Sequence, residues 1–195
     1  MAAPALPLLA DFWLQERYYS ELMYESGVLS VQLLILCMCI TPLRFLTQSI
    51  RWLKPVNRWL LRNRRYFGVA CFGYGFIHLM VYLRQYPDIA DILNQAIRPE
   101  LATGWIAMFA LTALALTSND RSIRHLGHRW RTLHRLVYPI AALLYLHWYL
   151  IGFFLQVLNF WYTPLVLFLI YRIVRRTSRH KQNQRCNPPT VQHSH

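Results

Sequence analysis

The chain has 195 residues and a formal net charge of +13, and 55% of its residues are hydrophobic while only 15% are charged. A soluble domain of this size carries roughly 25% charged residues, so the composition argues against a soluble enzyme. The basic residues lie in three blocks between long apolar runs, which argues against nucleic-acid binding. Leu, Ile, Val and Phe are too abundant in the middle of the chain for disorder there. The length allows one domain, and the composition indicates a membrane protein.

Four apolar stretches follow one another along the chain: 28–46, 66–83, 101–116 and 136–171. A hydrocarbon core about 30 Å thick needs roughly 20 helical residues. The last stretch, with 36 residues, would extend for about 54 Å as one helix. We therefore expect it to fold back between residues 152 and 164, where Asn159 interrupts the apolar run, and to supply two spans.

These stretches predict an all-α integral membrane helix bundle with about five transmembrane helices, because backbone polar groups in lipid must be satisfied within the segment. Residues 27–174 are expected to form the membrane domain. Residues 1–26 would be an extracytoplasmic segment, with 2–14 lying on the membrane surface. Residues 175–195 would be a basic cytoplasmic tail, expected to be disordered.

The charged residues separate clearly between alternate loops. The loop after the first span, the loop after the third span and the tail together hold 18 of the 21 basic residues, whereas seven of the eight acidic residues lie in the other segments. The positive-inside rule then places the C-terminus in the cytoplasm and the N-terminus outside. An odd number of spans agrees with both placements.

Three of the eight histidines belong to the predicted spans: His78 lies within the second, and His134 and His147 lie at the start and in the interior of the fourth. An ionisable residue inside a membrane helix is costly and marks a candidate functional site. The other five histidines are expected to be solvated surface residues.

His78 and His147 should reach the same depth, some 18–20 Å from the cytoplasmic ends of two parallel helices. Two neutral imidazoles at one depth can be the axial ligands of a haem. Arg64, which cannot ligate iron, stands at the depth of His134. The 13-residue step from His134 to His147 leaves open whether both rings point inward, and Pro139 between them can change the helix phase. Glycines near His78 leave room for a close neighbour or a flat macrocycle; they are Gly68, Gly73 and Gly75.

Several motifs are similar to one family. They are Ile-Thr-Pro-Leu at 40–43, Arg-Arg-Tyr-Phe-Gly at 64–68, Ile-His-Leu at 77–79, Leu-Thr-Ser at 116–118 and Leu-Gly-His-Arg-Trp-Arg-Thr-Leu-His-Arg-Leu-Val-Tyr at 126–138. Over roughly 27–176 the chain closely resembles the MsrQ/YedZ family, the haem-binding membrane subunits of a periplasmic methionine-sulfoxide reductase, which belong with the ferric-reductase-like transmembrane domains.

The resemblance implies a bacterial inner-membrane protein with haem b, and with flavin mononucleotide as a further candidate cofactor. It implies electron transfer from a cytoplasmic flavin reductase or the quinone pool to an MsrP-like periplasmic molybdopterin reductase. By position, His78, His134 and His147 match the family's functional histidines, and Arg64 matches an Arg there. Family members usually begin with an additional helix before the Ile-Thr-Pro span, which bears on the identity of the outer partner.

The leading interpretation is an electron-transfer subunit without catalytic residues of its own, in which His78 and His147 ligate a single haem. His134 and Arg64 would then serve electron uptake by binding an anionic group. A ferric or other metal reductase core is the alternative within the same group of families. A haem-free transporter or membrane scaffold is the alternative from a different class.

Overall fold

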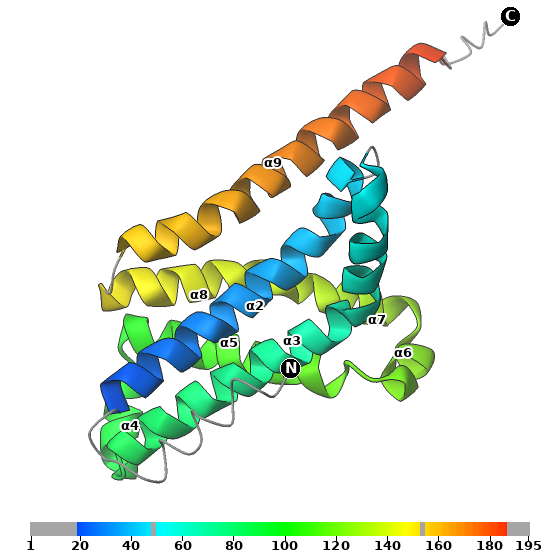
Figure 1. Ribbon diagram of the computed structural model, residues 1–195. Helices are drawn as coiled ribbons and strands as arrows, with labels where there is room; N and C mark the ends of the chain where they lie inside the picture. The colour runs from blue at the N-terminus through cyan, green and yellow to red at the C-terminus, as the bar shows by residue number, and fades with distance from the viewer. Residues whose placement is uncertain (1–18, 48–49, 153–154, 187–195) are drawn as a thin grey trace, which may run out of the picture.

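The computed structural model describes residues 19–47, 50–152 and 155–186, and every regular element among them is helical (Figure 1). The elements are α2 (Tyr19–Thr47), η2 (Arg51–Leu53), α3 (Lys54–Gln85), α4 (Ile89–Ala96), α5 (Pro99–Leu116), α6 (Asp120–Leu126), α7 (His128–Leu133), η3 (His134–Leu136), α8 (Val137–Ile151) and α9 (Leu155–Cys186). The predicted all-α class is confirmed. The surface segment predicted at 2–14 lies outside the described residues.

The helix starts follow local sequence signals. Helices α3 and α5 each have a proline in the first turn, where the missing N–H costs nothing and the fixed φ suits a helix. The carboxylate of Asp88 accepts a hydrogen bond from the N–H of Ala90 at the start of α4. The amide oxygen of Asn119 accepts one from the N–H of Ser122 at the start of α6. Such caps satisfy donors that the first turn leaves unpaired.

The predicted reversal in the last apolar stretch occurs at Gly152. Helix α8 ends at Ile151, Gly152 takes a left-handed conformation with φ of +76°, and α9 begins at Leu155. A left-handed residue after the last helical turn is a common helix terminator, and glycine adopts it without a steric penalty. Asn159 and Pro164 lie inside α9 rather than at the reversal.

Three helices extend well beyond the apolar stretches that predicted them. Helix α3 begins at Lys54, twelve residues before the stretch at 66–83. Helix α2 begins at Tyr19, nine residues before the predicted apolar stretch at 28–46. Helix α9 continues to Cys186, so the prediction of disorder from residue 175 was wrong for 175–186. No proline or glycine follows Pro164 in the chain until Pro188, and nothing in that polar sequence therefore breaks the helix.

The long helices form two antiparallel pairs. Helix α2 packs along α3, and α5 packs along α8, while α9 leans on α2 and α8 (Figure 1). The pairs meet in one apolar core to which all five long helices contribute. Representative members are Leu34 of α2, Cys71 of α3, Leu111 of α5, Ile140 of α8 and Leu165 of α9.

Helices α2, α3 and α5 contain the stretches Tyr19–Leu43, Lys54–Gln85 and Pro99–Leu116, which are long and apolar enough to cross a membrane. Helix α8 has 15 residues, and the apolar part of α9, Asn159–Tyr171, is also shorter than a full span. Large apolar side chains remain exposed on the outer faces of these helices, among them Phe109 and Phe160. Such a surface is expected of helices surrounded by lipid.

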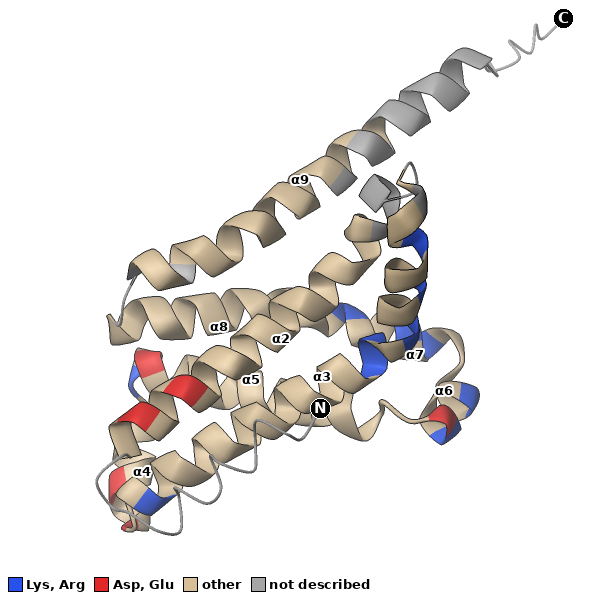
Figure 2. Cartoon of the chain, in the orientation of Figure 1, with Lys and Arg blue, Asp and Glu red and all other residues tan. Residues whose placement is uncertain are grey.

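The two ends of the bundle carry opposite charges (Figure 2). Most acidic residues gather at the end formed by the start of α2, by α4 and by the start of α5, which we call the acidic end. Lys and Arg gather at the opposite end, on the first half of α3 and on α6 and α7, which we call the basic end. An ion pair between Arg65 and Asp120 ties α3 to α6 at the basic end.

Candidate functional site

His78 lies on α3 with its half-buried ring against α2. Its Nδ1 is 2.7 Å from the carbonyl oxygen of Met23. Because a carbonyl can only accept a hydrogen bond, Nδ1 must carry the proton and donate. In the neutral ring Nε2 then keeps its lone pair. Among the described residues, none is hydrogen-bonded to that nitrogen.

His147 lies on α8 and repeats this arrangement against α5. Its Nδ1 is 2.5 Å from the carbonyl oxygen of Glu100. The hydroxyl of Thr103 donates to the same carbonyl oxygen at 2.9 Å. The bond between His147 and Glu100 again fixes the tautomer with the proton on Nδ1. Nε2 of His147 has no hydrogen-bond partner within the described part of the chain. The two helix pairs therefore each supply one imidazole with a free Nε2.

Both rings lie toward the acidic end, because Met23 lies near the start of α2 and Glu100 in the first turn of α5. The rings are close enough for a charge on His147 to act electrostatically on His78. Histidines that ligate metals commonly donate their second N–H to a backbone carbonyl, which fixes the ring and leaves the other nitrogen for the metal. The two free Nε2 atoms are thus of the kind that ligates a metal ion.

His134 lies in η3 at the basic end and differs from the other two. Its Nδ1 is 3.1 Å from the carbonyl oxygen of Trp130, and its Nε2 is 3.3 Å from the hydroxyl oxygen of Ser118. The ring also stacks on the indole of Trp130, with the centroids 3.9 Å apart. Trp130 is itself held by a hydrogen bond from its indole N–H to the carbonyl oxygen of Thr117. Both ring nitrogens of His134 thus have a protein oxygen within hydrogen-bond distance, and the single hydrogen of the Ser118 hydroxyl is shared between Nε2 and the carbonyl oxygen of Leu114, which lies 2.6 Å away.

The helix is interrupted between His134 and His147, so helical phase does not relate the directions of the two rings. His134 belongs to the 3₁₀ turn η3, whereas α8 begins at Val137. The two residues therefore do not share one continuous α-helix. Pro139 stands near the start of α8 and does not kink its interior.

Arg64 lies on α3 near the basic end and ties this helix to α2. Its Nε donates to the carbonyl oxygen of Cys37, and one terminal nitrogen donates to the hydroxyl of Thr41, each at 3.1 Å. The thiol of Cys37 in turn approaches the carbonyl oxygen of Arg64 at 3.5 Å. Arg64 is also near enough to act electrostatically on His134. The structure thus brings Arg64 and His134 into one neighbourhood, separate from the His78–His147 pair.

Of the three glycines predicted from the sequence to allow close packing, only Gly75 does so. Gly75 allows close packing, because a Cβ there would lie 3.2 Å from the hydroxyl of Ser30, whereas a Cβ at Gly68 or Gly73 would meet nothing within 4 Å. Sequence reasoning missed Gly27 and Gly104, which lie against the rings of His78 and His147. Only the pairing of helices identifies them, and the sequence does not give that pairing.

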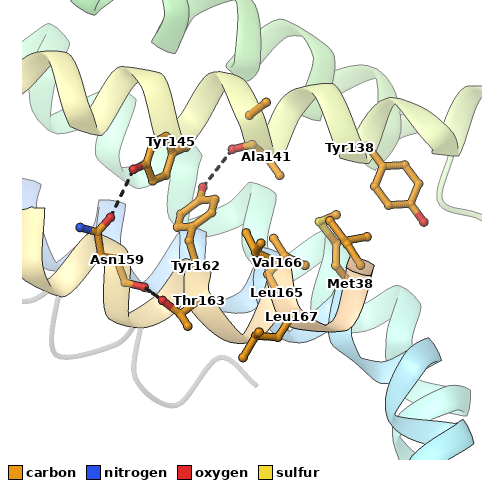
Figure 3. Close-up of a pocket in the computed structure, with 12 residues that line it drawn as sticks. Met38, Tyr138, Ala141, Tyr145, Asn159, Tyr162, Thr163, Leu165, Val166 and Leu167 are labelled. Carbon is orange, nitrogen blue, oxygen red and sulfur yellow. Dashed lines mark hydrogen bonds between the residues drawn. The ribbon is translucent and has the colours of Figure 1, made fainter. Parts of the chain in front are cut away.

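A separate cavity of about 520 Å³ lies between α8 and α9, with Met38 of α2 in its wall (Figure 3). Its walls are mostly apolar. The hydroxyl of Tyr145 donates to the amide oxygen of Asn159, and the hydroxyl of Tyr162 donates to the carbonyl oxygen of Ala141. None of the three histidines lines the cavity, so it is not part of the imidazole site.

Comparison with known proteins identifies a membrane family to which the chain is similar. The ferric reductase like transmembrane component family matches residues 26–145. The protein-methionine-sulfoxide reductase heme-binding subunit MsrQ of Azospira oryzae is 36% identical over 152 residues, which cover 74% of this chain and 62% of that protein. The MsrQ of Xanthomonas campestris pv. campestris is 32% identical over 177 residues, covering 87% and 76% respectively. The MsrQ of Brucella anthropi is 33% identical over 169 residues, covering 82% and 70%.

The match thus spans less than two thirds of the Azospira protein but about three quarters of the Xanthomonas one. No solved structure matches the chain. The family pattern nevertheless covers more than half of the chain, and the relatives align with most of it. The resemblance seen in the sequence is confirmed: the chain is a multi-pass bacterial membrane protein that belongs to the ferric-reductase-like transmembrane family and, within it, to the MsrQ family.

Proposed function

We propose that this chain is a haem b-containing electron-transfer subunit that passes electrons from a donor at the basic end to a periplasmic, MsrP-like methionine-sulfoxide reductase. The observation that carries the proposal is the pair of imidazoles with free Nε2 atoms at the acidic end. The MsrQ relatives are described as heme-binding subunits of such a reductase, which supports the same conclusion.

His78 and His147 are the proposed axial ligands. When bound, the haem iron supplies one-electron chemistry by alternating between its ferric and ferrous states. The chain itself holds the two ligands in place. The carbonyl groups of Met23 and Glu100 fix the proton on Nδ1 of each ring, and this keeps the lone pair of Nε2 available to a metal ion. The apolar helices exclude water from the site.

The charge distribution sets the proposed direction of electron flow. The positive-inside rule places the basic end in the cytoplasm and the acidic end outside. The imidazole pair then lies in the outer half of the membrane, on the side of the reductase that receives the electrons. The donor, a flavin reductase or a quinol, acts on the cytoplasmic side.

His134 and Arg64 belong to the side where electrons are taken up. Both nitrogens of His134 are engaged by Trp130 and Ser118, which supports a role other than ligating a second haem. Exposed arginines flank it, among them Arg131 and Arg135. Such a basic rim is suited to an anion, namely a haem propionate, the phosphate of flavin mononucleotide or an acidic reductase.

An absorption spectrum of the detergent-purified chain tests the proposal. We expect the narrow bands of a low-spin, six-coordinate haem b and a single haem per chain in a pyridine haemochrome assay. A chain that folds and inserts but carries no haem contradicts the proposal, because no electron carrier then remains.

The orientation is tested independently of the cofactor. Reporter fusions after residue 90, in α4, should be active outside the cytoplasm, and fusions after residue 125, in α6, should be active inside. The reverse pattern would invert the proposed route of electrons. The span number is tested by the same series, since five spans place fusions near residue 152 outside and fusions in the tail inside.

Reduction of ferric iron at the outer face is a second candidate, favoured by the match to the ferric reductase like family. One assay distinguishes the two candidate functions. Vesicles that contain the reduced chain are given either a periplasmic methionine-sulfoxide reductase with its substrate or a ferric chelate. Reoxidation of the haem by the reductase alone supports the proposed function, and reoxidation by the chelate alone supports the second candidate.

A further inference from the structure

The rings of His78 and His147 are each in close contact with a glycine of the neighbouring helix, Gly27 of α2 and Gly104 of α5. A Cβ at Gly104 would lie 2.8 Å from Cε1 and 2.9 Å from Nδ1 of His147. A Cβ at Gly27 would lie 3.0 Å from Nδ1 and 3.2 Å from Cε1 of His78. Atoms that are not bonded to each other rarely approach so closely. The imidazole rings therefore occupy the space that any other side chain would fill.

The two contacts share one local geometry. The carbonyl that accepts from His78 belongs to Met23, four residues before Gly27, and the carbonyl that accepts from His147 belongs to Glu100, four residues before Gly104. In a helix the Cβ of a residue leans toward the N-terminus and covers the turn before it. A missing Cβ therefore uncovers the carbonyl group four residues earlier. We call each carbonyl with its glycine a notch.

We propose that these two notches, Met23–Gly27 on α2 and Glu100–Gly104 on α5, set the direction of the axial ligands, so that Gly27 and Gly104 are positioning residues for the haem. The inference rests on the proposed haem site. Two unrelated segments on different helices form the same notch, and each holds one of the two imidazoles. Each notch fixes the ring twice, through the Nδ1–H hydrogen bond and through contact of the ring with bare backbone.

The distances predict a graded effect of adding one methyl group. Alanine at Gly104 places its Cβ under 3.0 Å from two atoms of a rigid ring, so the ring must leave its position and its carbonyl bond must lengthen. Alanine at Gly27 brings its Cβ to 3.0 Å from one ring atom, so a shift of a few tenths of an ångström suffices. Gly68 and Gly73 provide matched controls, since both lie in α3 and an added Cβ there meets nothing within 4 Å.

The experiment compares the full chain with its G104A, G27A, G68A and G73A variants, purified in the same detergent. The readouts are haem per chain, the low-spin electron paramagnetic resonance spectrum and the midpoint potential from a spectroelectrochemical titration. We expect G104A to lose more than half of its haem and to show a shifted or high-spin signal in the remainder. G27A should keep more haem with a smaller spectral shift, and the two controls should match the unmodified chain.

A second measurement tests the effect of the notch on the histidine tautomer in the absence of haem. In haem-free protein with ¹⁵N-labelled histidine, the nitrogen shifts of His147 should report a proton fixed on Nδ1. In G104A they should report a mixture of tautomers. Wild-type haem content, spectrum and potential in G104A, or an unchanged tautomer in its haem-free form, would overturn the inference. Absence of haem from the unmodified chain would instead contradict the proposed function, while the tautomer measurement would still decide on the notch.

Discussion

The acidic and basic ends of the bundle use histidine in opposite ways. At the acidic end, His78 and His147 are each held by Nδ1 alone, so that Nε2 is free. At the basic end, His134 is engaged through both nitrogens and stacked on Trp130. A ligand must keep a lone pair available, whereas a residue that shapes a surface has its polar atoms satisfied within the protein. The hydrogen bonds of each ring therefore distinguish the two proposed roles, which depth in the membrane alone does not.

The sharpest way to break this comparison is to remove a ligand. We expect His78→Ala and His147→Ala each to abolish stoichiometric haem binding, because a bis-imidazole site loses one of its two axial ligands. The measurement is haem per chain with the reduced absorption spectrum. His128→Ala, at an exposed position of the basic end, is the control. A normal low-spin spectrum in either site variant would show that the ligand pairing is wrong.

Removal of His134 should leave the haem and slow its reduction. His134→Ala deletes the stack on Trp130 and the contact with Ser118 but touches neither notch. We expect most of the haem spectrum to remain while the rate of reduction by a cytoplasmic flavoprotein falls severalfold. The rate is measured by stopped-flow absorption, with dithionite as a donor that needs no docking site. Loss of half of a measured two-haem content would instead identify His134 as a ligand.

Arg64 should matter more for stability than for haem content. Arg64→Ala leaves the carbonyl of Cys37 and the hydroxyl of Thr41 without their Arg64 partner. Loss of a partner by a buried polar group costs about 1–3 kcal/mol. We expect Arg64→Ala to lower the melting temperature while the folded chain still binds haem. Arg64→Lys should recover part of the lost stability, because lysine keeps the charge but lacks the planar guanidinium group. Arg62, exposed on the same helix, gives the control variant, and equal melting temperatures for both alanine variants would contradict the role of Arg64.

The smallest expected effect is a pH dependence at the basic end. Burial lowers the pKa of His134, the hydrogen bond to the Trp130 carbonyl raises it, and nearby Arg64 lowers it, with a net decrease. The folded chain therefore favours the neutral ring. Its contribution to stability is complete above the ordinary histidine pKa of about 6.5 and is lost as the pH falls below that value.

Melting temperatures between pH 7.5 and 5.5 test this dependence. The unmodified chain should lose slightly more stability on acidification than His134→Ala does. Parallel curves for the two proteins would mean that His134 does not titrate in this window, and a larger loss in the variant would reverse the sign of the inferred shift.

The sequence was sufficient for the features that depend on neighbouring residues. Apolar length, the basic loops and the rarity of a histidine in an apolar run led to the all-α membrane class and to His78 and His147 as candidates. The chain reversal near Gly152 also followed from the length of an uncharged run. The notches could not be predicted, because they join residues that are 55 and 47 positions apart. The pairing of α2 with α3 and of α5 with α8 must be known first.

The helices α6 and α7 and the turn η3 escaped prediction for a related reason. They lie in a short basic segment without a long apolar face, and the cap at Asn119 and the positive φ of Gly127 shape them locally. The engagement of His134 then depends on Ser118, which lies on the far side of this segment. Helical phase alone therefore gave no answer for His134, since the chain changes its helical geometry between this residue and His147.

The turn at Gly152 also bears on how the chain enters a bilayer. Helix α8, with 15 residues, would extend for about 22 Å, and the apolar part of α9 is shorter still. Neither piece is long enough to be recognised reliably as a membrane span when it leaves the ribosome alone. Joined by a reversal of a few residues, they present one apolar hairpin to the insertion machinery. We therefore expect the two helices to enter as a unit, and the reversal at Gly152 to return the basic second half of α9 to the side of the membrane from which α8 starts.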